Sequence, residues 1–217
     1  MLKSPIEFIK FFRRFFDLNF IMKVYCYSKY EFDRLMEDQG LKECPNPNIF
    51  TISIQNYEEN LLRNTHYFKK DIKSGVYNNY NLNIDDCSPF WWGDSDFYDK
   101  SLELYKNGKV KESNSYFCHL YKTKMNVIQN TDPSMLHILD YEDAFYLAKL
   151  IDDIMNNGNI DIYVHCEAGV SRSQSVVRYI LDVYGKEKHI ETREENPCIT
   201  PNSHVLMMLK RAYYNLK

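Results

Sequence analysis

The sequence predicts an α/β fold of the three-layer αβα type, with a mostly parallel central sheet. Short segments rich in β-branched and aromatic residues alternate with segments whose apolar residues recur at helical spacing. Parallel strands need a crossover connection, usually a helix, so this alternation favours a parallel sheet covered on both faces. The 217 residues can bury one substantial core and do not require a second. We therefore expect one domain over residues 23–217, preceded by an extension over residues 1–22.

The first half of the domain supplies three of the predicted strands. Ser28 and Glu31 have the spacing of a capping box, in which the two side chains satisfy backbone amides at a helix start. Gly40 is a typical helix end. The predicted elements are, in order, a strand at residues 23–27, a helix from Ser28 to Gly40, a strand at 50–54, a polar helix at about 58–70 and a strand at 76–84 that ends at Asp85 and Asp86.

The second half of the domain has the clearest periodicity. Between Tyr141 and Met155 the apolar residues recur at helical spacing, and the Asn-Gly pair at 157–158 ends that helix. One strand and two helices follow it along the chain. They are a buried strand at residues 160–164, a helix from about Ser171 to Tyr184 that Gly185 ends, and an amphipathic helix that begins near Asn202.

Two regions do not fit this alternation. Residues 87–138 show no clear period, and we interpret them as an insertion or a lid. Residues 1–20 are rich in phenylalanine, and three positive charges in their middle are incompatible with a conventional membrane span. Aromatic and basic residues together also suit a membrane surface, but we favour a helix packed on the domain or a natural start at Met22.

Composition narrows the classes of partner. The chain has 27 basic and 30 acidic residues, a net charge of −3, so it has no general attraction for nucleic acid and any anion binding must be local. Its six cysteines show neither the short paired spacing of a zinc site nor the dense framework of a small secreted domain. We expect reduced thiols, a cytoplasmic location, and neither a metal nor a cofactor.

The most informative stretch is residues 165–173, which we call the signature segment. It reads His-Cys-Glu-Ala-Gly-Val-Ser-Arg-Ser and lies between a predicted strand and a predicted helix. Backbone amides at a helix start have no intrahelical partners and can converge on an anion, while a glycine lets the loop approach that anion closely. We therefore predict a phosphate cradle made by Glu167, Ala168, Gly169, Val170, Ser171 and Arg172.

The same segment supplies the groups for covalent chemistry. A cysteine at a helix start near an arginine is commonly a thiolate at neutral pH, so Cys166 is the predicted nucleophile. Arg172 offers a planar fork that matches two phosphate oxygens, which lysine cannot do. Ser173 can donate its hydroxyl to the Cys166 sulfur and so favour the thiolate as a leaving group. His165 is expected to orient the loop by hydrogen bonding rather than to transfer protons.

The signature segment resembles the cysteine-dependent protein tyrosine phosphatase superfamily, whose loop is His-Cys-x5-Arg-Ser/Thr. Its Gly-Val-Ser-Arg-Ser ending is similar to the dual-specificity branch, and the Pro201-Asn202 pair before the last helix is similar to compact microbial and viral members. The resemblance covers residues 23–86 and 139–214 and leaves out 87–138. It implies a phosphatase fold and hydrolysis of phosphorylated proteins or peptides through a phosphocysteine.

The resemblance also implies an aspartate that protonates the leaving group and later activates water. Asp86 is our first candidate, because it follows the third strand, where small relatives carry their acidic loop. Three alternatives stay open: Asp85 beside it, Asp94 in a Trp-Gly-Asp sequence, and Asp132, which lies 34 residues before Cys166. An aspartate in a loop is most often solvated or capping, so each has an ordinary structural explanation as well.

The leading prediction is a phosphomonoester hydrolase for protein phosphotyrosine, or a dual-specificity phosphatase. Inositol phosphate or an RNA 5′-phosphate is an alternative substrate, although the acidic Glu167 disfavours highly charged polyphosphates. A catalytically weak module that binds phosphorylated partners is the competing class, and it follows if no aspartate reaches the leaving group. Sulfur transfer or arsenate reduction also uses loop cysteines, but the Arg172-Ser173 ending fits phosphoryl transfer better.

Overall fold

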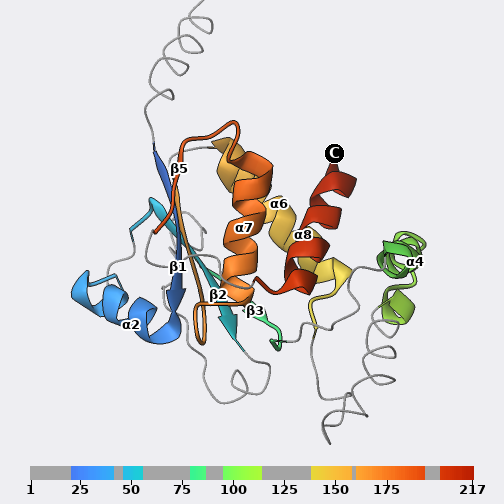
Figure 1. Cartoon of the computed structure of the whole chain (residues 1–217), viewed down its shortest axis with the longest axis horizontal. Coiled ribbons are helices and arrows are strands. Elements are labelled where there is room, and N and C mark those ends of the chain that lie inside the picture. The colour runs from blue at the N-terminus through green and yellow to red at the C-terminus, as the bar shows by residue number, and fades with distance from the viewer. Residues whose placement is uncertain are drawn as a thin grey trace, which may run out of the picture.

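A computed structural model gives the fold, and it describes residues 21–41, 46–55, 79–86, 95–113, 138–157, 160–193 and 201–217. Strands and helices alternate along most of this part of the chain (Figure 1). The elements are β1 (Met22–Ser28), α2 (Lys29–Asp38), β2 (Ile49–Gln55), β3 (Asn79–Asn83), α4 (Ser95–Lys106), α6 (Tyr141–Asn157), β4 (Asp161–Cys166), α7 (Arg172–Tyr184), β5 (Ile190–Glu191) and α8 (Ser203–Leu216).

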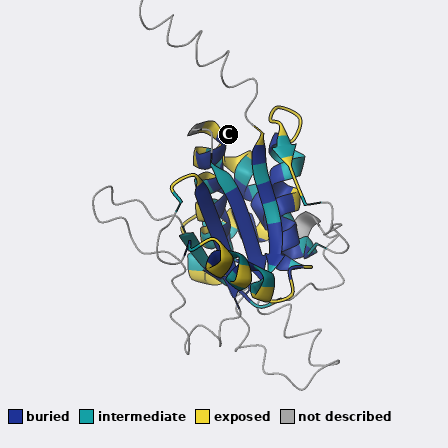
Figure 2. Ribbon diagram, turned by 90° about the vertical axis from the view of Figure 1, so that its left-hand side faces the viewer, coloured by how far each residue is buried: buried dark blue, intermediate teal, exposed yellow. Residues whose placement is uncertain are grey.

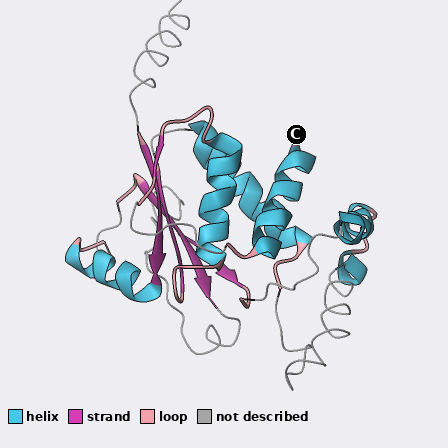
Figure 3. Ribbon diagram, in the orientation of Figure 1, coloured by secondary structure: helices cyan, strands magenta, loops and turns pink. Residues whose placement is uncertain are grey.

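The five described strands form one sheet in the order β3-β2-β4-β1-β5, and every pairing in it is parallel (Figure 3). The register pairs Val24 with Ile162 on one side of β4 and Ile52 with Val164 on the other. All seven residues of β2 are buried, as expected for an inner strand of a parallel sheet. The sequence predicted a mostly parallel sheet, and the parallel arrangement is confirmed.

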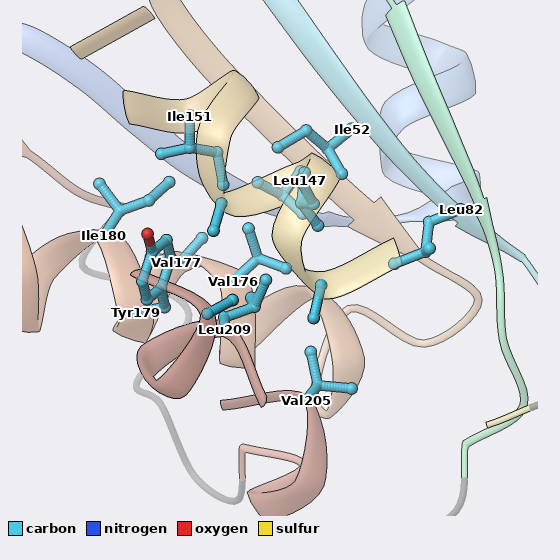
Figure 4. Close-up of a cluster of buried hydrophobic side chains, with 14 of the residues drawn as sticks. Ile52, Leu82, Leu147, Ile151, Val176, Val177, Tyr179, Ile180, Val205 and Leu209 are labelled. Carbon is cyan, nitrogen blue, oxygen red and sulfur yellow. The ribbon is translucent and has the colours of Figure 1, made fainter. Parts of the chain in front are cut away.

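Helices cover both faces of the sheet, with α2 on one side and α6, α7 and α8 on the other (Figure 1). Successive side chains of a strand point to opposite faces, so Ile162 and Val164 of β4 join the core under α6, α7 and α8, while Tyr163 joins the smaller cluster under α2. Figure 2 shows the sheet as a largely buried layer behind α2. Figure 4 shows the larger core, where Leu147, Val176 and Leu209 from three helices meet side chains of the sheet.

Most of the predicted elements occur where expected. The capping box is confirmed: the Ser28 hydroxyl accepts from the Glu31 amide, and the Glu31 carboxylate accepts from the Ser28 amide. The strand predicted at 76–84 is shorter, at Asn79–Asn83, and its first three positions lie outside the described residues. The helix predicted at 58–70 and the extension at 1–20 also lie outside them.

Two elements were not predicted from the sequence. The strand β5 has two residues, which is too short for an alternating pattern to be recognised. The helix α4 lies in the region interpreted as an insertion or lid. It packs on the core through Tyr98, which is fully buried and whose backbone carbonyl accepts a hydrogen bond from the Tyr141 hydroxyl at 2.8 Å.

The parallel arrangement brings the carboxyl ends of the strands to one edge of the sheet, which is where α/β proteins place their sites. Cys166 ends β4, Ser28 ends β1 directly opposite it, and Asp86 follows β3 by three residues. Within the described ranges, no helix has the length and apolar character needed to cross a membrane.

Candidate active site

The loop from Glu167 to Ala168, Gly169, Val170 and Ser171 joins the end of β4 to the first residue of α7. Gly169 has φ = 73°, a conformation that side chains with a Cβ rarely adopt. A Cβ placed on Gly169 would lie 2.5 Å from the Ser28 nitrogen and 2.8 Å from the Tyr27 carbonyl carbon, both backbone atoms of β1. Two features therefore require glycine at position 169: the positive φ angle and the close approach of the loop to β1.

The outer side of this loop is held by the start of α2. The Lys29 amide donates to the Glu167 carbonyl at 3.1 Å, and the two side chains form an ion pair at 3.8 Å. The Glu167 side chain is half exposed, so this pair contributes little to stability. Val170 is also exposed, whereas Gly169 is buried against β1. The predicted cradle residues thus form an outward-facing loop above a fixed glycine.

The predicted nucleophile, Cys166, is buried with 1% of its surface exposed, at the base of this loop. Its sulfur lies 3.0 Å from the Ser173 hydroxyl oxygen in the first turn of α7. This is the contact expected if Ser173 donates to the sulfur. The first turn of an α-helix also leaves its backbone N–H groups outside the helical hydrogen-bond ladder, on the side where the loop lies.

A second thiol, Cys26 of β1, lies on the other side of Ser173. Its sulfur is 3.0 Å from the Ser173 hydroxyl oxygen and 3.2 Å from the Gly169 carbonyl oxygen, and its single S–H hydrogen can be donated to one of the two at a time. Burial raises the pKa of Cys26 to about 12, so this group stays a thiol at neutral pH. When Cys26 donates to Ser173, the hydrogen of the Ser173 hydroxyl is left for the Cys166 sulfur.

The guanidinium of Arg172 is fixed beneath the same loop. Only 3% of the residue is exposed, and Nη1 donates to the Ile84 carbonyl at 2.6 Å. Ile84 follows β3, so the contact ties the start of α7 to the end of a strand far from it in sequence. On the same guanidinium, Nε lies 3.8 Å from Oδ2 of Asp86. The guanidinium thus contacts the segment after β3 at two places, Ile84 and Asp86.

The structure brings Asp86 to the signature segment. Its Oδ1 accepts a hydrogen bond from the Ser171 hydroxyl at 2.7 Å and another from the side-chain amide of Asn202 at 3.0 Å. The carboxylate remains 40% exposed, so a substrate can approach it. Its neighbour Asp85 is half-buried. The other two candidate acids, Asp94 and Asp132, lie outside the described residues.

His165 connects the base of the loop to the sheet. One ring nitrogen, Nε2, lies 2.7 Å from the Ser53 hydroxyl on β2, and the ring stacks on Phe32 of α2 at 4.2 Å between centroids. Burial, aided by the positive charge of Lys29, lowers the pKa of His165 to about 3, so the ring is neutral at physiological pH. These contacts tie the end of β4 to β2 and α2, and the expected role of His165 in orienting the loop stays a prediction.

Sequence reasoning missed two residues of this site. The sequence indicated Cys26 only as part of a strand, and Asn202 only as the start of a helix and as part of the Pro201-Asn202 pair in the resemblance. The sequence does carry a signal for Cys26. This residue lies two positions before the end of β1, and β1 neighbours β4 in the sheet. Because side chains alternate between faces, Cys26 and Cys166 point to the same face. Asn202 carries no such signal, because its contact with Asp86 joins residues separated by more than a hundred positions.

Comparisons of this chain with protein-family models, with curated proteins and with solved structures found no match. The functional argument therefore rests on the residues and contacts described above.

Proposed function

We propose that this protein is a phosphomonoester hydrolase that acts through a phosphocysteine on Cys166, with phosphotyrosine in proteins as its leading substrate. The observation that carries the proposal is the position of Asp86. A carboxylate that the sequence places 80 residues before Cys166 lies against the loop, hydrogen-bonded to Ser171 and 3.8 Å from Arg172. The resemblance of the signature segment to tyrosine phosphatases supports the same conclusion from independent residues.

The reaction has two steps. The Cys166 thiolate attacks phosphorus and forms a sulfur–phosphorus bond, while the bond between phosphorus and the ester oxygen breaks and Asp86 gives its proton to that oxygen. Water then attacks phosphorus, Asp86 takes a proton from it, and the sulfur–phosphorus bond breaks. Arg172 and the loop amides stabilise the phosphoryl oxygens in both transition states. The Ser173 hydroxyl donates a hydrogen bond to the Cys166 sulfur as the sulfur–phosphorus bond breaks.

A second candidate function is a phosphatase-like module that binds phosphorylated partners and turns them over slowly. This alternative is favoured by the contacts of Asp86 within the protein, because its carboxylate already accepts hydrogen bonds from Ser171 and Asn202 and lies 3.8 Å from Arg172, which would hold it away from a leaving group. Under this alternative the anion cradle survives and turnover falls by about 10²–10⁴-fold.

Hydrolysis of an aryl phosphate and of a phosphotyrosyl peptide by the wild type, Cys166→Ser, Asp86→Asn and Asp85→Asn tests these functions. The proposal predicts turnover by the wild type, none by Cys166→Ser, a loss of about 10²–10⁴-fold in Asp86→Asn and little change in Asp85→Asn. Tight binding of the peptide without turnover supports the binding module. Loss in Asp85→Asn alone, or in neither aspartate variant, places the acid elsewhere.

The substrate class is tested with the active wild type. Phosphotyrosyl and phosphoseryl peptides, an inositol phosphate and an RNA 5′-phosphate are compared by kcat/KM. Preference for the phosphotyrosyl peptide supports protein dephosphorylation, while preference for either of the last two replaces it with the corresponding alternative.

A further inference from the structure

We propose that Asn202 is a positioning residue for the reaction: it fixes the rotation of the Asp86 carboxylate so that Oδ2 is the oxygen that carries and delivers the proton. This inference rests on the proposed function and adds to it the part played by a residue of α8. Asn202 is buried, with 1% of its surface exposed, and it joins the start of its own helix α8 to the segment after β3 and to the start of α7.

Both polar atoms of the Asn202 side-chain amide form hydrogen bonds. Its Oδ1 accepts a hydrogen bond from the Val205 amide at 3.1 Å and so caps α8, while its Nδ2 donates to Oδ1 of Asp86 at 3.0 Å. Rotating the amide group by half a turn would set an oxygen against a carboxylate and two N–H groups against a backbone N–H. Both contacts would then be repulsive, so the cap fixes the direction in which the amide donates.

The backbone of Asn202 is tied to the signature segment as well. Its N–H donates to the Ser171 carbonyl at 3.3 Å, and its carbonyl accepts from the Ser175 hydroxyl at 2.9 Å. The Ser175 hydroxyl also lies 3.0 Å from the Ser171 carbonyl. The start of α8 is therefore attached to the start of α7, and the amide of Asn202 is held at a set place relative to the loop.

These contacts distinguish the two oxygens of Asp86. Oδ1 accepts from both Ser171 and Asn202, and an oxygen that accepts two hydrogen bonds is a poor place for a proton. Oδ2 lies on the side of the Arg172 guanidinium, 3.8 Å from Nε, where the transferred phosphoryl group would bind. Among the contacts described, Oδ2 accepts no hydrogen bond, so it is the oxygen left to carry the proton toward a leaving group bound beside Arg172.

Asn202→Asp is the sharpest test, since it keeps an N-cap acceptor and the side-chain shape but replaces the donor by an oxygen that repels Asp86. A general acid matters most when the leaving group is poor. We expect kcat to fall by about 10–100-fold on phenyl phosphate, with a much smaller loss on 4-nitrophenyl phosphate, whose leaving group needs little protonation. The acidic and basic limbs of the kcat–pH profile should also shift in this variant.

Three further variants make the result specific. Asn202→Ser keeps the cap and removes the donor without adding charge, so it should show the same preference for the good leaving group and remains informative if Asn202→Asp fails to fold. Asn215→Asp adds the same charge to the exposed end of α8 and should leave both rates unchanged. The double variant Asp86→Asn with Asn202→Asp should be no slower than Asp86→Asn alone, because both substitutions remove the same function, proton donation by Asp86.

Equal losses on the two aryl phosphates, or additive losses in the double variant, overturn the positioning role. So does wild-type activity in Asn202→Asp, and in each of these cases the proposed hydrolase stands. A wild-type protein without turnover on either aryl phosphate overturns the proposed function and this inference together.

Discussion

The two halves of the candidate site are built differently. The nucleophile half, residues 165–173, is one continuous stretch between a strand and a helix, and β1 supports it through Gly169 and Cys26. The acid half is assembled from the end of β3 and the start of α8, where Asp86 and Asn202 meet. The first half is thus continuous in sequence and supported by β1, whereas the second is brought together only by tertiary packing.

This difference indicates which substitutions should leave the signature segment intact and which should not. The hydrogen bonds of Asp86 reach the loop through Ser171, and Arg172, itself part of the nucleophile half, contacts the acid half at both Ile84 and Asp86. Arg172 is therefore the residue at which a single change damages both halves. Other changes should damage one half and spare the other.

Among the variants that compare the two halves, the largest expected effect is that of Arg172→Lys. Lysine keeps the charge but loses the planar fork that holds two phosphoryl oxygens, and it cannot reproduce the 2.6 Å bond to the Ile84 carbonyl in the same geometry. We expect kcat on an aryl phosphate to fall by about 10²–10³-fold. Arg178→Lys is the matched control on the same helix, because that side chain is half-exposed and pairs only locally with Asp182 at 2.8 Å among the contacts described. Equal losses in both variants would contradict a special place for Arg172.

Gly169→Ala should damage the nucleophile half alone. The added methyl group would lie 2.5 Å from a backbone nitrogen of β1 in a backbone conformation with φ = 73°. We expect a loss of about 3 kcal/mol or more in the free energy of unfolding, together with loss of turnover. Gly40→Ala has a similar φ of 62° but no atom within 4 Å, so it isolates the backbone term of about 1 kcal/mol. Urea unfolding of the two variants makes the comparison, and equal losses would show that contact with β1 is unimportant.

The same contrast explains what the sequence could predict. The loop, its flanking strand and helix, and the residues Cys166, Arg172 and Ser173 follow from local spacing and from the resemblance. Asp86 was the first candidate because it follows a predicted strand at the position where the resemblance implies an acidic loop, and in the structure it lies at the edge of the sheet where Cys166 ends β4. Its partners could not be predicted, since hydrogen bonds from Ser171 and Asn202 depend on how three segments pack in space.

For the fold, the elements with a strong local sequence pattern are those that were predicted correctly. The helix α6 and the capping box at Ser28 are strongly patterned, and both occur as predicted. The strand order β3-β2-β4-β1-β5 has no signature in the sequence, because the pairing of strands is set by contacts between distant residues. The helix α4 was missed for a similar reason, since the buried position of Tyr98 depends on α6 and α8.

Acid should weaken both halves through one buried histidine in each. His165 lies under the loop and His204 lies two residues after Asn202, and burial lowers the pKa of each from 6.5 to about 3. Below pH 6.5 the unfolded chain binds protons that the folded one does not, so stability falls as the pH drops from 6.5 toward 3. We expect a slope that approaches about 1.4 kcal/mol per pH unit for each histidine.

Urea unfolding between pH 6.5 and 5 measures this slope before carboxylates contribute. Contacts with Ser28 lower the pKa of Glu31, for example, so its contribution is lost only below about pH 4.5. His165→Asn and His204→Asn should each remove about half of the slope. His189→Gln, at an exposed position, should remove none of it. A slope that survives both buried substitutions would contradict this assignment.

The smallest expected effect is that of Ser28→Ala. This variant tests whether the nucleophile half depends on the N-terminal cap of α2. The variant removes the cap acceptor for the Glu31 amide, at a cost of about 1 kcal/mol in the free energy of unfolding, and Ser28→Thr should restore most of it. The backbone of Ser28, which touches Gly169, is unchanged by the substitution, so the rate on an aryl phosphate should stay within about twofold. A tenfold fall in rate with a loss of only 1 kcal/mol would instead mean that the loop depends on the cap of α2. The nucleophile half would then be less self-contained than its continuous sequence suggests.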